Sequence, residues 1–244
     1  MTENIKEALQ YAVNLANEKP QTILGQDGKE YFDRNKYSLA ELRTKRRPKT
    51  LNLSTLNSLV DYLKSDLNSI NKKRLMIVVE NPTQIIVCEH DDEDLDRNVL
   101  VTVEAITPQV NFGRYEAASD FNIILQSKFV DSDDRPTVIE FASALKIENG
   151  SEIIDDGISQ TATIKQGVAS LVKAKAPNPV TLRPYRTFAE VEQPASQFIF
   201  RINQRAEMAL FEADGGKWRL DAINNIANFL KEELADQTNI TILA

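Results

Sequence analysis

Apolar residues recur at the three- and four-residue spacing of an amphipathic helix in several parts of the chain. The segments are residues 5–16, 56–70, 117–129 and 218–234. Pro20 follows the first segment and cannot continue a helix, and Ser54 precedes the second as an N-cap. Ser119 and Asp120 are the cap candidates of the third. The pattern therefore predicts a helix with one apolar face in each segment.

Short runs rich in β-branched and aromatic residues predict strands. They are residues 75–79, 85–88, 99–106, 159–164, 180–185, 198–202 and 208–211, and residues 240–243 fit an edge strand. Asn81–Thr83 and Asp155–Gly157 have the composition of turns, while residues 138–145 fit a helix and a buried strand equally. Because strands and helices do not alternate regularly, the sequence predicts an α+β fold with mainly antiparallel sheet and flanking helices.

The composition changes near residue 48. Residues 1–48 combine the first amphipathic helix with a polar, glycine-containing segment that we interpret as an extended basic arm. Residues 49–244 are predicted to form the α+β body, with a sub-domain at 50–108 and a larger part that ends with the C-terminal helix. An arm that leaves a domain often reaches a neighbouring subunit, so the sequence predicts a homo-oligomer.

The composition is that of a folded protein in a reducing compartment. Of the 244 residues, 42% are hydrophobic and 27% are charged. The single cysteine, Cys88, excludes an intrachain disulfide. No apolar run reaches the roughly 18 to 20 residues of a membrane span, and no leader pattern opens the chain. We therefore expect a cytoplasmic protein without a membrane partner.

The net charge of −7 disfavours a general coating of nucleic acid, since phosphate binding requires Lys and Arg. One basic patch nevertheless stands in the arm, formed by Arg43, Lys45, Arg46, Arg47 and Lys49. It is typical of a solvated connector ahead of a helix. The alternative is a contact with phosphate or with an acidic partner surface, so Arg43, Arg46 and Arg47 are candidate binding residues.

No familiar catalytic arrangement is found in the sequence. The only histidine, His90, stands two residues after Cys88 on a predicted strand, a pattern typical of a packed cysteine beside a solvent-exposed histidine. Neither glycine-rich type of phosphate loop is present. The sequence thus predicts no catalytic residue, no cofactor and no enzymatic activity.

Acidic clusters also fail to match a metal site. The run at 91–96 lacks the alternating ligands and central glycine of a calcium loop, and Asp131, Asp133 and Asp134 form another acidic turn. Glu212, Asp214 and Lys217 imitate a metal-dependent nuclease, but the glycines between them are typical of a strand-to-helix connection. No metal ligand is therefore predicted.

The segment 177–188 is dense in residues with special conformational demands. Its prolines favour an edge strand or an extended arm, while Arg183, Tyr185 and Arg186 supply cationic and aromatic surface. Because Arg and Tyr are frequent interface anchors, these three residues are candidate contacts with a subunit or ligand. The alternative is a strand with a proline-stiffened entrance.

Several strings along the chain resemble a family of phage and prophage proteins catalogued as domain of unknown function 2303. They are Asn111–Arg114, Asp155–Gln160, Pro177–Phe188, Glu190–Pro194 and Phe211–Gly216, and the likeness spans residues 50 to 236. The resemblance implies a phage or prophage origin among early genes near recombination and replication functions. It supplies no catalytic residues.

Together these features favour a non-enzymatic phage-type early protein that acts by self-assembly and by binding a phage or host protein. One alternative is a nucleic-acid-binding accessory of recombination or replication, in which the basic patch, Arg183 and Arg186 contact phosphates. Another is an anti-defence protein that sequesters a host factor or a nucleotide signal. Nucleic acid is the less favoured partner because of the acidic net charge.

Overall fold

A computed structural model describes residues 2–17, 23–24, 30–31, 49–90, 97–145, 153–157, 159–166 and 170–244. Contacts along the chain separate two compact units, Met1–Arg47 and Pro48–Ala244. The candidate binding residues Arg43, Arg46 and Arg47 lie outside the described residues, as does most of the predicted arm.

The first unit contains the predicted N-terminal helix. Helix α1 covers Thr2–Asn17, and the two-residue strands β1 (Ile23–Leu24) and β2 (Glu30–Tyr31) pair antiparallel. The helical spacing at 5–16 therefore predicted this element correctly.

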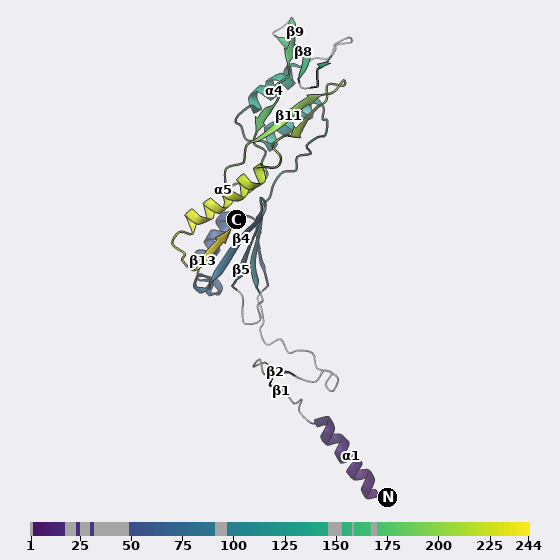
Figure 1. The fold of residues 1–244 in the computed structure, drawn as a ribbon, viewed down its shortest axis with the longest axis vertical. Coiled ribbons are helices and arrows are strands. Elements are labelled where there is room, and N and C mark those ends of the chain that lie inside the picture. Colours follow the sequence, from purple (N-terminus) through teal and green to yellow (C-terminus); the bar gives the residue numbers. More distant parts are fainter. Residues whose placement is uncertain are drawn as a thin grey trace. The chain divides into compact units, whose positions relative to one another are not determined.

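The second unit begins with a mixed five-stranded sheet, drawn in Figure 1. Its strands are β3 (Leu51–Leu53), β4 (Leu75–Asn81), β5 (Gln84–Glu89), β6 (Val99–Glu104) and β13 (Ile240–Leu243), in the spatial order β13-β4-β5-β6-β3. The central pairs are antiparallel, whereas β13 and β3 join the two edges parallel to their neighbours. The edge strand predicted at 240–243 is present.

Helix α2 (Leu56–Lys64) begins with the predicted segment 56–70 but is shorter. Its N-cap is Thr55, whose hydroxyl accepts from the Ser58 N–H at 3.2 Å, so the assignment of Ser54 as the cap was wrong. The helix stops because the N–H and the hydroxyl of Ser65 both donate to the Tyr62 carbonyl. The 3₁₀ helix η1 (Leu67–Lys72) follows.

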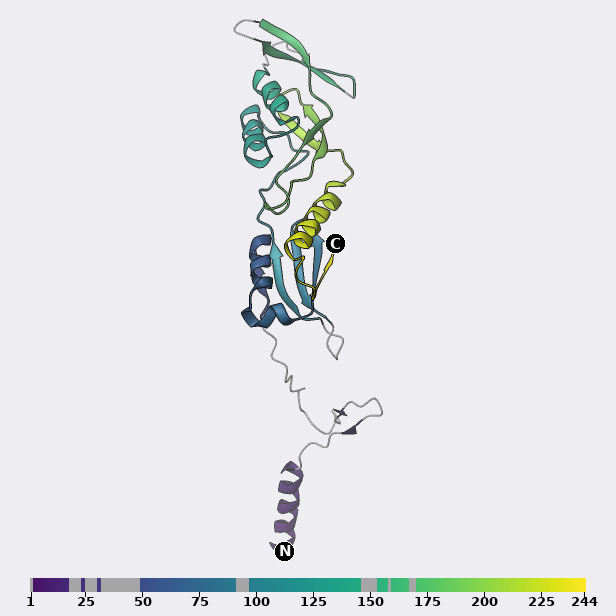
Figure 2. The same cartoon turned by 90° about the vertical axis from the view of Figure 1, so that its left-hand side faces the viewer.

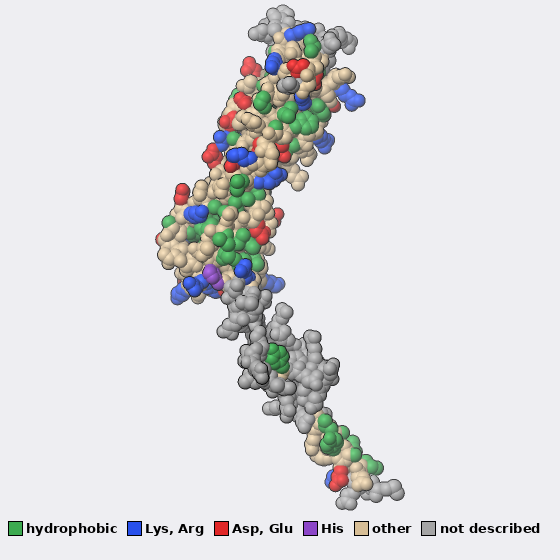
Figure 3. All heavy atoms as spheres, in the orientation of Figure 1, with side chains coloured by type: hydrophobic (Ala, Val, Ile, Leu, Met, Phe, Trp, Pro, Cys, Tyr) green, Lys and Arg blue, Asp and Glu red, His purple; other side chains and the backbone are tan. Residues whose placement is uncertain are grey.

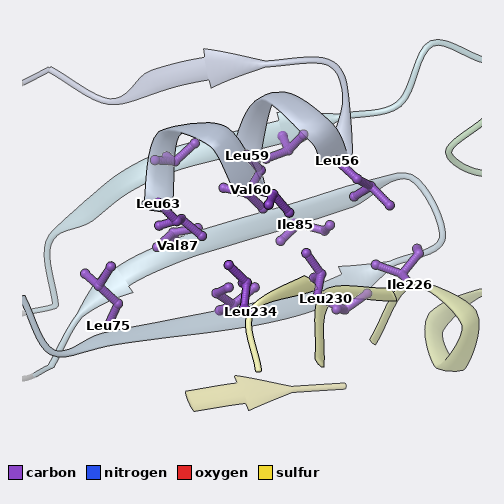
Figure 4. Packing of buried hydrophobic residues seen from close by; sticks show 14 of the residues in the cluster. Leu56, Leu59, Val60, Leu63, Leu75, Ile85, Val87, Ile226, Leu230 and Leu234 are labelled. Carbon is purple, nitrogen blue, oxygen red and sulfur yellow. The ribbon is translucent and has the colours of Figure 1, made fainter. Parts of the chain in front are cut away.

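One hydrophobic cluster, called the sheet core below, lies between the sheet and two helices. Helix α5 (Trp218–Glu233) contributes to it together with α2 (Figure 4). Its buried members are Leu56, Leu59, Val60, Leu63, Ile70, Leu75, Ile77, Val79, Ile85, Val87, Leu100, Val101, Val103, Phe188, Val191, Ile226, Leu230 and Leu234. The predicted sub-domain at 50–108 is thus completed by the C-terminal helix and strand, which the sequence had assigned to the larger part.

A second cluster, the phenylalanine core, lies around the antiparallel sheet β10 (Val180–Leu182), β11 (Ser196–Ile202) and β12 (Met208–Glu212). Its buried members are Phe121, Leu125, Phe129, Val138, Phe141, Ala142, Ala162, Ala176, Val180, Leu182, Phe198, Phe200, Ile202, Met208 and Leu210. Five phenylalanines in this set supply much of its apolar surface, because aromatic side chains bury large areas.

Helices α3 (Ala118–Lys128) and α4 (Arg135–Ala144) pack side by side against this second core (Figure 2, teal). The ambiguous segment 138–145 is therefore mostly helix. Ser119 and Asp120 were wrong as caps of α3, because both lie inside its first turn and Ala117 occupies the cap position. Strands β7 (Ile154–Asp155), β8 (Gln160–Gln166) and β9 (Ser170–Lys175) add a second three-stranded antiparallel sheet.

These elements confirm the predicted α+β class with its helices and largely antiparallel pairing. The two parallel pairs at the edges of the large sheet are the exception.

Replacing Leu230 by alanine is expected to lower the free energy of unfolding by about 2 to 5 kcal/mol, because this fully buried side chain fills space in the sheet core. Urea-induced unfolding measures the change. Leu220→Ala on the same helix is the control: its side chain is 61% exposed, and its truncation should change stability by less than about 0.5 kcal/mol. Equal losses in the two variants would contradict the packing of α5.

Candidate functional site

Three segments pass between the sheet core and the phenylalanine core. They are residues 105–117 after β6, residues 183–195 between β10 and β11, and residues 213–217 between β12 and α5. The loop 183–195 leaves the phenylalanine core, places Phe188 and Val191 in the sheet core, and returns. Four of the five strings that carried the family resemblance therefore reach this junction, and the fifth, Asp155–Gln160, lies in β7 and β8 away from it.

Gln193 fixes the shape of the loop 183–195 from the inside. Its side-chain oxygen accepts from the N–H groups of Arg186 at 3.0 Å and Thr187 at 3.3 Å. Its side-chain nitrogen donates to the carbonyls of Phe188 at 2.9 Å and Val191 at 3.3 Å. Gln193 is buried, so these bonds satisfy polar atoms that water does not reach. The two halves of the loop are thus held together by one amide.

The guanidinium of Arg186 joins this loop to the segment after β12. Its Nη1 donates to Glu212 Oε1 at 2.8 Å, and its Nη2 donates to the hydroxyl of Ser196. Ser196 in turn donates to Asp214 Oδ2 at 2.6 Å, and Asp214 Oδ1 accepts from the Gly216 N–H at 2.9 Å. One buried cation therefore organises the strand end and the turn that leads into α5.

Two aromatic rings lie close to this guanidinium. The Cζ atom of Arg186 lies 3.8 Å from the ring centroid of Trp218 and 5.9 Å from that of Phe198. Phe112 stacks on Phe198 with a centroid distance of 5.1 Å, and Arg219 Cζ lies 4.8 Å from the centroid of Trp218. From Phe198 in the phenylalanine core, the guanidinium of Arg186, the ring of Trp218 and the guanidinium of the exposed Arg219 thus follow one another as cation–π contacts.

Arg186 is only 9% exposed, and its charge is costly to bury. Burial lowers the pKa of Arg186 to about 10, although the charges of Glu212 and Asp214 act in the opposite direction. The buried Nε of Arg186 and Nε1 of Trp218 have no hydrogen-bond partner among the described residues. The fold therefore holds a cation whose compensation depends on a few carboxylate and hydroxyl contacts.

Asp214 is held in its ionised form. Partial burial alone would raise its pKa, but the Ser196 hydroxyl, the N–H groups of Gly216 and Trp218, and the charge of Arg186 together lower that pKa below its ordinary value. The carboxylate also faces the start of α5, where anionic groups are favoured. Asp214 is therefore a structural anion.

An open hollow of about 380 Å³ adjoins this network. Among the residues that border it are Gln109, Asn111, Tyr185, Arg186, Trp218 and Arg219. Glu212 also reaches it and is the only carboxylate among the described residues of the lining. The volume of the hollow lies within the range of small-ligand sites.

The structure separates the three residues predicted as contacts in the segment 177–188. Arg183 donates from Nε to Asp133 Oδ2 at 2.8 Å and also pairs with Glu192. Its guanidinium is therefore paired with two carboxylates of its own chain. Arg186 was expected at the surface and is buried, because the loop carries it between the two cores. Tyr185 is 39% exposed and borders the hollow.

The carboxylates that imitated a nuclease have structural partners. Glu212 and Asp214 serve the Arg186 network, and Lys217 Nζ lies 2.5 Å from Asp221 Oδ2, one turn along α5. This confirms the strand-to-helix connection. The sequence did not reveal that Glu212 and Asp214 lie around Arg186. Its only link between them was that both strings, Phe211–Gly216 and Pro177–Phe188, resemble the same family.

The remaining candidates for chemistry lie apart from the hollow. Cys88 is buried, which raises the pKa of its thiol, and His90 is exposed. The acidic run at 91–96 lies outside the described residues. In the part of the chain that the structure describes, no three His, Cys, Asp or Glu side chains are grouped as metal ligands.

Comparisons with protein-family models, curated proteins and solved structures found no match to this chain. Among the described helices, none combines the length and the apolar character needed to cross a membrane.

Substituting Glu212 by glutamine is expected to lower the free energy of unfolding by about 1.5 to 3 kcal/mol, because it removes a charged partner from the buried Arg186. Glu192→Gln is a matched control. That carboxylate also pairs with an arginine but its side chain is 73% exposed, so the loss should stay within about 1 kcal/mol. Thermal or urea unfolding compares them, and a larger effect at Glu192 would speak against the network.

Asp214→Asn should weaken the acid dependence of stability. Since the folded-state pKa of Asp214 is below its ordinary value of 3.8, its charge stabilises the fold fully above that value and this contribution disappears as the pH falls through the folded-state pKa. The difference in unfolding free energy between wild type and variant should therefore shrink between about pH 6 and pH 2. A difference that stays constant over this range would contradict the assignment.

Proposed function

We propose that this chain is a non-enzymatic, phage-type protein that assembles with copies of itself and binds a partner in the cytoplasm of the host cell. The observation that carries the proposal is the exposed apolar face of helix α1. The resemblance of the strings around Arg186 to phage and prophage proteins supports the phage origin.

The apolar side chains of α1 are open to solvent (Figure 3, green). Ile5, Leu9, Tyr11, Val13 and Leu15 are between 48% and 70% exposed. The positions 5, 9 and 12 follow the alternating four- and three-residue steps of a coiled-coil seam. An uncovered face of this kind favours association.

A second copy of the same helix is the partner that this face fits best. A helix of 16 residues is marginally stable alone in water, so its formation is favoured by packing. Its only charged residues are Glu3, Lys6 and Glu7, so two copies meet with little of the repulsion that the net charge of the whole chain would produce. Burying each large aliphatic side chain contributes about 1.5 to 3 kcal/mol.

The second unit supports a binding role. The polar cluster around Arg186 lies between its two cores, and in that cluster Arg186, Glu212 and Asp214 are linked to one another directly or through Ser196. The adjoining open hollow, with exposed tyrosine and arginine side chains, has the residue types that dominate binding interfaces.

Leu9→Glu is expected to shift the protein from a dimer or larger assembly to monomer, because it places a charge in the apolar face of α1. Sedimentation velocity or mass photometry at micromolar concentration measures the assembly. Asn14→Glu is the control, since residue 14 lies on the opposite side of the helix and the same charge should leave the assembly intact. A wild-type chain that stays monomeric would refute self-assembly.

A further inference from the structure

The lining of the hollow beside Arg186 carries an excess of positive charge. Among the described residues that line it, the charged ones are two arginines, Arg186 and Arg219, and one carboxylate, Glu212. Asp214, which accepts from Ser196, also compensates Arg186 but does not border the hollow. Within the lining Arg186 and Glu212 pair with each other, so Arg219 has no carboxylate partner there. Among the described residues it makes no ion pair. In a chain of net charge −7, this local balance favours an anionic ligand.

Arg219 is positioned by its surroundings. Its guanidinium lies over Trp218, and its Nη1 atom lies 2.6 Å from the point where a Cβ atom on residue 216 would stand, closer than such an atom could come. Gly216 also has a φ of +82°, a conformation in which a side chain would be strained. The glycine thus leaves room for the arginine to rest on the ring.

Flat and hydrogen-bonding groups stand beside this charge. The ring of Tyr185 is partly exposed in the lining, and its backbone N–H is fixed by a 3.0 Å bond to the Lys128 carbonyl. Gln109 and Asn111 are exposed, and neither side-chain amide bonds to another described residue. The Lys128 ammonium donates to the Gln109 carbonyl at 2.7 Å and holds this segment in place.

We propose that this hollow binds a nucleotide unit, with its phosphate on Arg219, its base against Tyr185, and the base edge facing the amides of Gln109 and Asn111. Nucleobases stack on tyrosine rings and on guanidinium planes, and amide side chains hydrogen bond to their edges. An acidic peptide would use the charge of Arg219 but would leave the flat surfaces without a matching group. The nucleotide unit therefore satisfies more of the lining than a carboxylate does.

The same chemistry is present in a free mononucleotide and in a single strand of nucleic acid. The site lies wholly in the second unit, so the inference does not rest on self-assembly through α1. Nucleotide binding and self-assembly are measured separately, so either proposal can be refuted while the other holds.

Trp218 is the only tryptophan of the chain, so its fluorescence reports on the hollow alone. The full chain is titrated with adenosine monophosphate, guanosine monophosphate, a ten-nucleotide single strand of deoxyadenosine, and a ten-residue glutamate peptide. Calorimetry of the same mixtures detects binding that leaves the fluorescence unchanged. We expect saturable binding of a nucleotide form that weakens as salt is raised.

Arg219→Gln should weaken this binding about tenfold by removing the charged contact with phosphate. Tyr185→Leu should weaken it by a similar factor of about ten through the loss of stacking. Arg205→Gln is the matched control. Arg205 is exposed in the turn between β11 and β12 and does not border the hollow, so this variant should bind as the wild type does.

The outcomes separate the sources of the ligand. Tighter binding of a monophosphate indicates a free nucleotide, and tighter binding of the single strand indicates a nucleic acid; either supports the proposal when it depends on Arg219 and Tyr185. Binding of the glutamate peptide alone overturns it, as does the lack of binding of every nucleotide form. Equal losses in the Arg219 and Arg205 variants also overturn it, because the effect would then be one of net charge.

Discussion

The burial of one guanidinium constrains the whole second unit. Removing Arg186 from water is unfavourable, and the fold accepts this only because Glu212, Ser196 and the ring of Trp218 surround the group. These partners come from three parts of the chain, and they must be in place together. A buried ion pair adds little to stability on its own, but it selects one arrangement of the segments that meet around it.

The fixed arrangement of the segments around Arg186 explains why the sheet core and the phenylalanine core belong to one unit. The loop 183–195 contributes to both cores, and Thr187 Oγ1 donates to the Pro82 carbonyl at 2.5 Å, which joins the loop to the turn between β4 and β5. The chain then crosses again into α5 and β13, which complete the sheet core. A cut near residue 108 would therefore separate β3 to β6 and α2 from α5 and β13, which complete the same sheet and core.

The spacing and types of neighbouring residues predicted the longer helices and strands, which such short-range patterns define. The strands at 75–79 and 85–88 are short runs rich in β-branched residues, and the long helices show one apolar face, so both were found. The three-residue strand β3 was missed because its pairing with β6 defines it. The partners of Arg186 were missed for the same reason, since contacts between residues distant in sequence leave no periodic signal. The cap of α2 differed by one residue because Ser54 and Thr55 have the same chemistry.

The net charge of a chain is a weak guide to the charge around one of its surfaces, for a physical reason. At physiological salt, charges more than about 8 Å apart are largely screened from one another. The electrostatic field in the hollow is therefore set mainly by Arg219, Arg186 and Glu212 in its lining and by Asp214 behind Arg186, and less by the acidic residues elsewhere. The same screening applies to α1, whose own few charges decide whether two copies can approach. An acidic chain can thus contain both a surface for self-association and a site for an anion, provided that each is locally neutral or positive.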